Sequence, residues 1–316
     1  MRVVFLGTPP TAVPSLEAIL AAGHDVPLVV TRPDRPSGRS GALQPSAVKR
    51  AAAGRGLAVL QPESLRGPET AAAIARERAD VLAIVAYGRK LPAAMLRAAP
   101  LGAVNLHFSL LPAYRGAAPV AWALARGETS TGVSTFLLDE GLDTGDLLEQ
   151  VRLPIEPGEH APGLLTRLAG VGAPALVRTL DALASGTARA TPQDHGRATT
   201  APLLRRDDGA FDAAWSARDL EGRVRGFDPW PGVWAQRQGS RLRITSARAL
   251  DGTVITSAPG TVLAEGERIC VACASGTVAE ILAVQPEGRR AVSAREARNG
   301  RQLLPGDRLE PPRPAA

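Results

Sequence analysis

The amino-terminal third of the chain alternates between short apolar runs and alanine-rich segments, and this alternation restricts the possible folds more than any other feature. The expected strands are Val3–Leu6, Val26–Val30, Val81–Val85 and Ala103–Leu106, and the segments of helical composition between them are 12–22, 46–53 and 69–78. Strands that are joined by helices pair in parallel through right-handed crossovers. The expected fold class is therefore α/β, with a doubly wound, mainly parallel sheet.

The pattern changes after a long expected helix at 162–185. The segment 189–210 is rich in Gly, Thr, Pro and charged residues, and we take it as a linker. Beyond it, short strand-like runs alternate with glycine turns, at Leu242–Thr245, Thr253–Thr256, Gly260–Leu263, Ile269–Cys273 and Ala279–Val284. A chain of 316 residues also exceeds the usual size of one core. We therefore expect two domains, of which the second is a small all-β barrel.

Asn105 and His107 stand two residues apart at the end of an expected strand, directly before a loop stopped by proline. Residues i and i+2 of a strand point to the same face, so both side chains would project into one cleft. Asp143 follows later, between Gly141 and Gly145, which let the backbone turn sharply. An amide, an imidazole and a carboxylate that converge would supply an oxyanion donor, a proton carrier and a group that orients it. The alternative is a hydrogen-bonded structural histidine and an ordinary Asp-Gly turn.

Two further segments follow expected strands, namely Gly7-Thr8-Pro9 and Ala86-Tyr87-Gly88. Ligands of doubly wound sheets bind outside the carboxyl ends of the strands, so these segments would gather with Asn105 and His107 at one edge. The first segment lacks the G-x-G-x-x-G fingerprint, and Pro9 and Pro10 restrict its loop. A nicotinamide or flavin enzyme is thereby disfavoured.

Positive charge is concentrated near one early loop. The formal net charge is +6, and residues 31–56 contain six basic residues against the single acid Asp34. The loop 31–44 combines three arginines with prolines and glycines, which suits contact with phosphate groups. The alternative is a charged surface loop without a role. Lys49 and Lys90 are the only lysines. Arginine therefore stands where other proteins use lysine, and genomic base bias is a second explanation for part of the arginine excess.

The two cysteines and the apolar runs exclude several other classes. Cys270 and Cys273 form a single CxxC without a second pair or a suitably spaced histidine, so we expect neither zinc nor a disulfide. No apolar run approaches the roughly 20 residues that span a membrane, and the first run ends at Gly7, too early for a signal peptide. We expect a cytoplasmic protein.

Motifs that carry a wider resemblance occur in every part of the chain: Gly7-Thr8-Pro9, Arg32-Pro33-Asp34-Arg35-Pro36, Gln61-Pro62-Glu63-Ser64-Leu65, Ala86-Tyr87-Gly88, the segment 105–119, Asp139–Leu148, Arg225-Gly226-Phe227-Asp228-Pro229-Trp230-Pro231-Gly232 and Gln285-Pro286-Glu287-Gly288-Arg289-Arg290. In this order they resemble the family of bacterial methionyl-tRNA formyltransferases. The resemblance implies 10-formyltetrahydrofolate as the co-substrate and methionyl-initiator tRNA as the acceptor. It also implies a formyltransferase catalytic domain at 1–188, a linker at 189–210 and an OB-like tRNA-binding domain at 211–316.

The chemistry follows from the implied reaction, in which the α-amine of methionyl-tRNA attacks the formyl carbon of the folate. The electrophile is already activated, so the enzyme needs placement, an oxyanion donor and a proton route. The resemblance assigns Asn105 to the oxyanion and protonated His107 to sharing that charge or delivering a proton to the departing N10. Asp143 would stabilise the imidazolium and accept the amine proton, directly or through water. No metal is required.

The resemblance also implies binding residues. The rim of the folate site would be Ser109, Leu110, Leu111 and Pro112, and its other wall Tyr87, Gly88, Leu91 and Pro92. Contact with the tRNA substrate would come from Arg39, Arg35, Gly7, Thr8 and Pro9.

The chain departs from the family pattern in three places. Ser40-Gly41-Ala42-Leu43 follows Arg39 where lysines are usual, which puts the strength of the loop contact in question. Pro202-Leu203-Leu204-Arg205-Arg206 lacks the usual lysine, and Pro10-Thr11 replaces Glu-Phe. Trp230 and Trp234 are expected in the core rather than as platforms for stacked bases.

Three other functions are compatible with the same catalytic residues. They are formyl transfer to a glycinamide nucleotide or a sugar amine, hydrolysis of the folate to formate, and tRNA binding without activity. The arginine-rich loop and the added carboxyl-terminal domain favour tRNA as the acceptor, and the presence of Asn105, His107 and Asp143 argues against a decayed site. We expect no obligate protein partner and a monomer.

Overall fold

The computed structural model of the protein describes residues 1–36 and 41–311. It contains two compact units. The first comprises Met1–Pro119, Ser130–Pro154 and Leu165–Pro202, and the second comprises Val120–Thr129, Ile155–Leu164 and Leu203–Ala316. No helix in the described ranges is long and apolar enough to cross a membrane.

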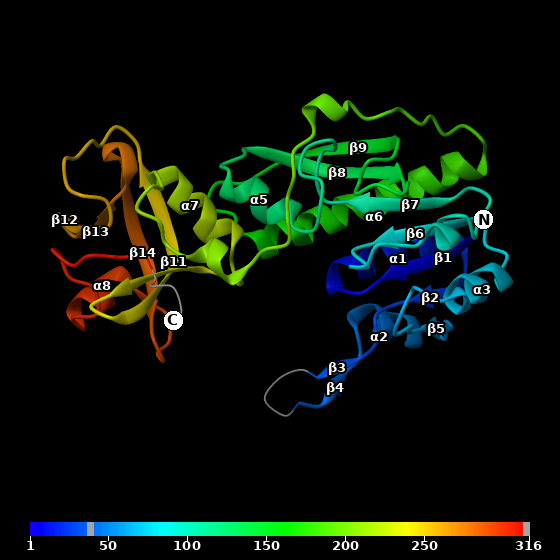
Figure 1. Cartoon of the computed structure of the whole chain (residues 1–316), viewed down its shortest axis with the longest axis horizontal. Coiled ribbons are helices and arrows are strands. Elements are labelled where there is room, and N and C mark those ends of the chain that lie inside the picture. The colour runs from blue at the N-terminus through cyan, green and yellow to red at the C-terminus, as the bar shows by residue number, and fades with distance from the viewer. Residues whose placement is uncertain (37–40, 312–316) are drawn as a thin grey trace. The chain divides into compact units, whose positions relative to one another are not determined.

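The first unit is built on a seven-stranded sheet (Figure 1). Its strands, in spatial order, are β5 (Val59–Leu60), β2 (Asp25–Val30), β1 (Arg2–Gly7), β6 (Val81–Val85), β7 (Ala103–His107), β8 (Ser130–Leu137) and β9 (Leu147–Pro154). Pairing is parallel from β5 to β7, whereas β8 and β9 are antiparallel. The expected mainly parallel α/β sheet is confirmed, and the two antiparallel strands were not foreseen.

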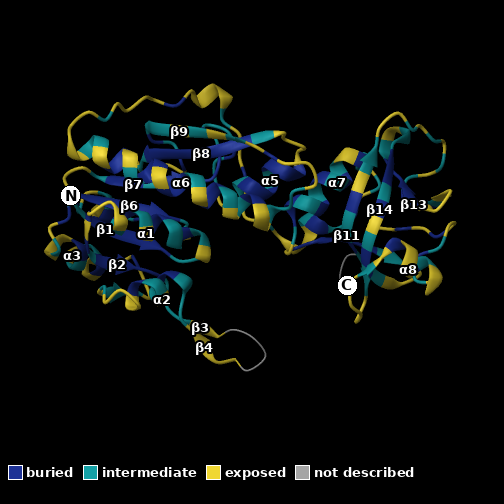
Figure 2. Cartoon of the chain, turned by 180° about the vertical axis from the view of Figure 1, so that it is seen from behind, coloured by how far each residue is buried: buried dark blue, intermediate teal, exposed yellow. Residues whose placement is uncertain are grey.

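The central strands are buried because helices connect them. The helices are α1 (Val13–Ala21), which follows the 3₁₀ turn η1 (Pro10–Ala12), α2 (Ala47–Ala53), α3 (Pro68–Arg76), α4 (Ala93–Leu96) and α6 (Ala161–Ala184). Every residue of β6 is buried, and β1 is buried from Val3 onward, as the dark strands of Figure 2 show. Strands that are covered on both faces read as continuous apolar runs, which is why the sequence revealed them.

A short hairpin of β3 (Arg35–Pro36) and β4 (Leu43–Gln44) projects from the first unit (Figure 1). Its base is anchored through Asp34, whose carboxylate accepts hydrogen bonds from Lys49 Nζ at 2.6 Å and Gln61 Nε2 at 2.7 Å. These two hydrogen bonds, first that of Lys49, lower the pKa of Asp34. These contacts hold the chain in place directly before β3.

The second unit holds an antiparallel sheet with helices beside it. The strands are β10 (Val233–Arg237), β11 (Ser240–Leu250), β12 (Val262–Glu265), β13 (Arg268–Ala272), β14 (Val278–Pro286) and β15 (Val292–Ser293), and the helices are α5 (Pro119–Ala125), α7 (Ala217–Gly226) and α8 (Ala294–Asn299). The described residues also form the 3₁₀ turns η2 (His195–Arg197) in the first unit, and η3 (Arg206–Gly209) and η4 (Ala274–Gly276) in the second. A Cβ atom on Gly222 of α7 would lie 2.6 Å from Leu124 O of α5, so the two helices approach at their backbones.

Two sequence expectations for this unit are wrong. Thr253–Thr256 is not a strand, because the turn at Gly252 ends β11 and Val254 is then 80% exposed. Trp230 is 54% exposed rather than in the core, because it lies in a turn between two prolines. Trp234, on β10, is buried as expected.

Candidate active site

The paired strands fix the positions of Asn105 and His107. On β7, Asn105 lies opposite Ile84 of β6 and Phe136 of β8, and His107 lies opposite Ser134. The two side chains share a face of the sheet because they are two residues apart. His107 is 6% exposed and its ring packs edge-on against that of Phe136. An amide and an imidazole thus stand side by side at the end of β7.

The contacts of His107 determine which ring nitrogen is available for chemistry. Nε2 lies 2.9 Å from the backbone oxygen of Tyr114. A carbonyl oxygen only accepts, so Nε2 carries a hydrogen. Nδ1 faces the other way, 3.8 Å from Asp143 Oδ2. The nitrogen that can change its protonation state is therefore the one that faces the carboxylate.

Asp143 is held in an unusual conformation. Its φ of 52° lies in the left-handed region, which residues with a side chain rarely adopt. Its Oδ2 accepts a hydrogen bond from Gly116 N at 2.7 Å. The loop is tight, since a Cβ on Gly145 would lie 1.8 Å from Leu137 O. This glycine lets the loop fold back and present to His107 the Asp143 side chain, which is 11% exposed.

The loop after His107 is hydrogen-bonded to Ser134 of β8, which is fully buried. Ser134 Oγ accepts from Leu111 N at 3.0 Å and donates to Ser109 O at 2.7 Å. Gln150 Nε2 donates to the same hydroxyl at 2.8 Å and to Leu111 O at 2.9 Å. Leu110 and Pro112 are half-buried. The segment expected to form the folate rim is thus fixed mainly through its backbone.

Residues 189–202 of the expected linker pair with the loop around Tyr114 within the first unit. Thr199 Oγ1 accepts from Tyr114 N at 2.8 Å, and Ala201 N donates to Arg115 O at 2.7 Å. A Cβ on Gly116 would lie 2.6 Å from Ala201 O. This segment therefore determines the position of the two backbone groups that bind His107 and Asp143.

The segments Gly7-Thr8-Pro9 and Tyr87-Gly88, predicted for substrate and folate binding, are neighbours in the first unit. Thr8 Oγ1 donates to Tyr87 O at 3.2 Å, so the segments Gly7-Thr8-Pro9 and Tyr87-Gly88 lie together. The Tyr87 side chain packs in the core beside Leu91, its hydroxyl has no hydrogen-bond partner among the described residues, and burial raises its pKa. Pro92 precedes α4 and is half-buried. The side chains of Tyr87 and Leu91 belong to the core, and the backbone oxygen of Tyr87 binds Thr8.

Of the two arginines predicted to contact tRNA, the structure describes one. Arg35 is exposed on β3, opposite Gln44. Arg39 lies outside the described residues.

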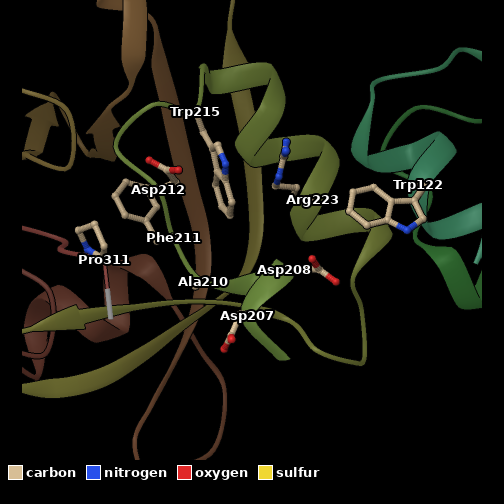
Figure 3. A pocket seen from close by; sticks show the side chains of 9 residues that line it. All are labelled: Trp122, Asp207, Asp208, Ala210, Phe211, Asp212, Trp215, Arg223 and Pro311. Atoms are coloured by element: carbon tan, nitrogen blue, oxygen red, sulfur yellow. The ribbon is translucent and has the colours of Figure 1, made fainter. Parts of the chain in front are cut away.

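A separate cavity of about 430 Å³ lies in the second unit and combines aromatic and acidic side chains (Figure 3). Its lining residues are Trp122, Asp207, Asp208, Ala210, Phe211, Asp212, Trp215, Arg223 and Pro311. Arg223 lies over the Trp215 ring at 4.5 Å and pairs with Asp219 at 3.3 Å. None of the predicted catalytic or binding residues that the structure describes belongs to this cavity. Within residues 1–36 and 41–311, no three His, Cys, Asp or Glu side chains are grouped to hold a metal.

Three supporting side chains were missed by the sequence analysis: Ser134, Gln150 and Gln193. Ser134 and Gln150 lie on antiparallel strands that were not foreseen, and Gln193 lies in the segment taken as a linker. Their partners are distant in sequence, so no local pattern marked them.

Comparison with known proteins identifies the family. A model of the formyl transferase family matches residues 1–180, and one of the formyl transferase C-terminal domain matches residues 203–302. The methionyl-tRNA formyltransferase of Koribacter versatilis (strain Ellin345) is 46% identical over 310 residues, which are 98% of each chain. That of Solibacter usitatus (strain Ellin6076) is 45% identical over 309 residues, again 98% of each chain.

Solved structures have the same fold at lower identity. An N-formyltransferase from Helicobacter canadensis in complex with folinic acid and dTDP-3-aminofucose has a TM-score of 0.67 at 15% identity, covering 90% of this chain and 99% of the other. The glycinamide ribonucleotide transformylase 1 of Symbiobacterium toebii has a TM-score of 0.51 at 20% identity, covering 61% and 94%. From the matching family models and the full-length identities, this chain belongs to the formyl transferase family, among its methionyl-tRNA formyltransferases.

Proposed function

We propose that this protein transfers the formyl group of 10-formyltetrahydrofolate to the α-amine of methionyl-initiator tRNA. The observation that carries the proposal is the 46% identity to a methionyl-tRNA formyltransferase over 98% of both chains, because it extends through the carboxyl-terminal part. We assign catalysis to residues 1–188, a linker to 189–210 and tRNA binding to 211–316. Family matches at 1–180 and 203–302 support separate amino-terminal and carboxyl-terminal parts.

We propose Asn105, His107 and Asp143 as the catalytic residues. In the reaction, a bond forms between the amine nitrogen and the formyl carbon, the bond from that carbon to N10 breaks, the amine loses a proton and N10 gains one. Asn105 donates a hydrogen bond to the oxygen that becomes negative. Because His107 Nε2 donates to Tyr114 O, Nδ1 is the atom that gives and takes a proton. Asp143, 3.8 Å from Nδ1, stabilises the imidazolium and receives the amine proton through water.

Substrate binding is assigned to the segments around this group. The rim Ser109, Leu110, Leu111 and Pro112, with Tyr87, Gly88, Leu91 and Pro92, is proposed to hold the folate. Arg35 and Arg39 are proposed to contact tRNA phosphates, and Gly7, Thr8 and Pro9 to flank the acceptor end. A tRNA acceptor implies action in the cytoplasm, where we propose that the protein works as a monomer.

The test is formyl transfer from 10-formyltetrahydrofolate to charged initiator methionyl-tRNA. Parallel reactions contain uncharged tRNA, a glycinamide nucleotide, a sugar amine or no acceptor. We expect formylmethionyl-tRNA in the first reaction alone. Product only with a small amine, or formate without an acceptor, would overturn the assignment of tRNA as the acceptor while leaving the family intact.

A further inference from the structure

Gln193 uses every hydrogen-bonding position of its carboxamide beside the candidate active site. The residue is 5% exposed. Its Nε2 donates to Asp143 O at 3.0 Å and to Gly145 O at 2.7 Å. Its Oε1 accepts from Arg115, from Nη2 at 2.6 Å and from Nε at 3.2 Å. An amide has two N–H groups and two lone pairs, so all of its hydrogen-bonding capacity is taken and its orientation is fixed.

These hydrogen bonds hold the backbone of the loop around Asp143, which has a left-handed conformation. Asp143 has a φ of 52°, and the Gln193 amide binds its carbonyl and that of Gly145, two residues on. The carboxylate of Asp143 is bound separately by Gly116 N. A left-handed residue persists only where its surroundings impose it. Gln193 supplies that constraint on the backbone side.

Gln193 is itself held at a defined place. Two residues earlier, Thr191 and Leu147 exchange backbone hydrogen bonds of 2.9 and 2.8 Å. On the other side, Arg115 directly precedes Gly116, whose amide binds the Asp143 carboxylate. The contacts therefore form a closed ring, from Gln193 through Arg115 and Gly116 to Asp143 and back.

We propose that Gln193 is a positioning residue for Asp143, an inference that rests on the function proposed above. It keeps the carboxylate at its 3.8 Å distance from His107 Nδ1 by holding the loop backbone in the left-handed turn. Small displacements of a catalytic group reduce turnover strongly, by roughly 100-fold for about 1 Å. Loss of the two donors is expected to lower kcat by roughly 10- to 100-fold while the KM for each substrate changes less than about threefold.

Gln193→Glu isolates the donor side of this amide. The variant keeps an oxygen for Arg115 but places a second oxygen against two carbonyl groups. Ser185→Asp is the control, because Ser185 Oγ also donates to a backbone carbonyl of the first unit, Asp181 O at 2.9 Å, and lies outside the residues proposed for catalysis or binding. We expect the control to keep the wild-type kcat. If Gln193→Glu does not fold, Gln193→Met supplies a neutral side chain of similar length without donors.

Two further readouts distinguish positioning from a general structural effect. Hydrogen exchange of the Gly116 amide, which is bonded to Asp143 Oδ2, should accelerate at least several-fold in Gln193→Glu and not in the control. In an Asp143→Asn background, Gln193→Glu should lower kcat no further, because the group it positions is already lost. A wild-type kcat with unchanged Gly116 exchange, or a full additional loss in the Asp143→Asn background, would overturn the proposal.

The exchange measurement needs no substrate. If the wild-type protein makes no formylmethionyl-tRNA, the proposed function fails, and Gly116 exchange still decides whether Gln193 holds Asp143.

Discussion

Replacement of Ser134 by alanine tests whether the loop after His107 depends on one buried hydroxyl. Ser134 Oγ makes three hydrogen bonds at 2.7 to 3.0 Å, to Ser109 O, Leu111 N and Gln150 Nε2. The residue is fully buried, so water does not replace the lost partner. Alanine would leave the Leu111 amide without its acceptor.

The magnitude follows from these three bonds. Each is worth about 1 kcal/mol net, and a buried donor left unpaired costs about 1–3 kcal/mol. We therefore expect a loss of roughly 2–4 kcal/mol in the free energy of unfolding of the first unit. At about 3 °C per kcal/mol for a unit of this size, its Tm should fall by roughly 6–12 °C.

The assay is thermal unfolding followed by circular dichroism, with Ser130→Ala on the same strand as the control. Ser130 accepts one exposed hydrogen bond, from Arg152 Nη1, so its loss should cost less than about 0.5 kcal/mol. In enzyme assays, Ser134→Ala should raise the KM for 10-formyltetrahydrofolate more than it lowers kcat, because it releases the proposed folate rim. Equal Tm values for the two variants would refute the reasoning.

Three other predictions concern the site, the cysteines and the helices. His107→Ala should lower kcat by roughly 10²- to 10⁴-fold with the KM for tRNA within about threefold, and normal turnover in steady-state assays would contradict its role. Burial raises the pKa of Cys270 to about 11 and that of Cys273 to about 12. Neither thiol should therefore react with a thiol reagent at pH 8 until denaturant is added. Rapid labelling of the native protein would count against this. Gly222→Ala should lower the free energy of unfolding by roughly 1–3 kcal/mol, because its Cβ would lie 2.6 Å from a backbone oxygen. Gly170→Ala, whose Cβ would meet nothing within 4 Å, should raise it by roughly 0.5–1 kcal/mol. Denaturant titrations measure both changes, and the opposite order would be inconsistent with this packing.

The sequence identified those strands whose burial shows in their composition. β1 and β6 are covered on both faces and are therefore continuous apolar runs. β8 contains Ser and Thr at positions that are nevertheless buried, since Ser134 and Thr135 find hydrogen-bond partners elsewhere in the first unit. Thr253–Thr256 had strand composition but lacks a ladder partner. The composition of a segment indicates whether it is buried, whereas its pairing as a strand depends on neighbours that are distant in the chain.

The same division applies to the candidate site. The common face of Asn105 and His107 follows from the pleat of one strand, which is a local property that the chain carries wherever it folds. The approach of Asp143 to His107 and the role of Gln193 depend on loops closed by contacts between residues 27 to 50 positions apart. By itself, the sequence determined the family, the α/β sheet and the residue types of the site. Tertiary structure alone decided which nitrogen of His107 faces the carboxylate, because that choice depends on a carbonyl that another segment holds in place.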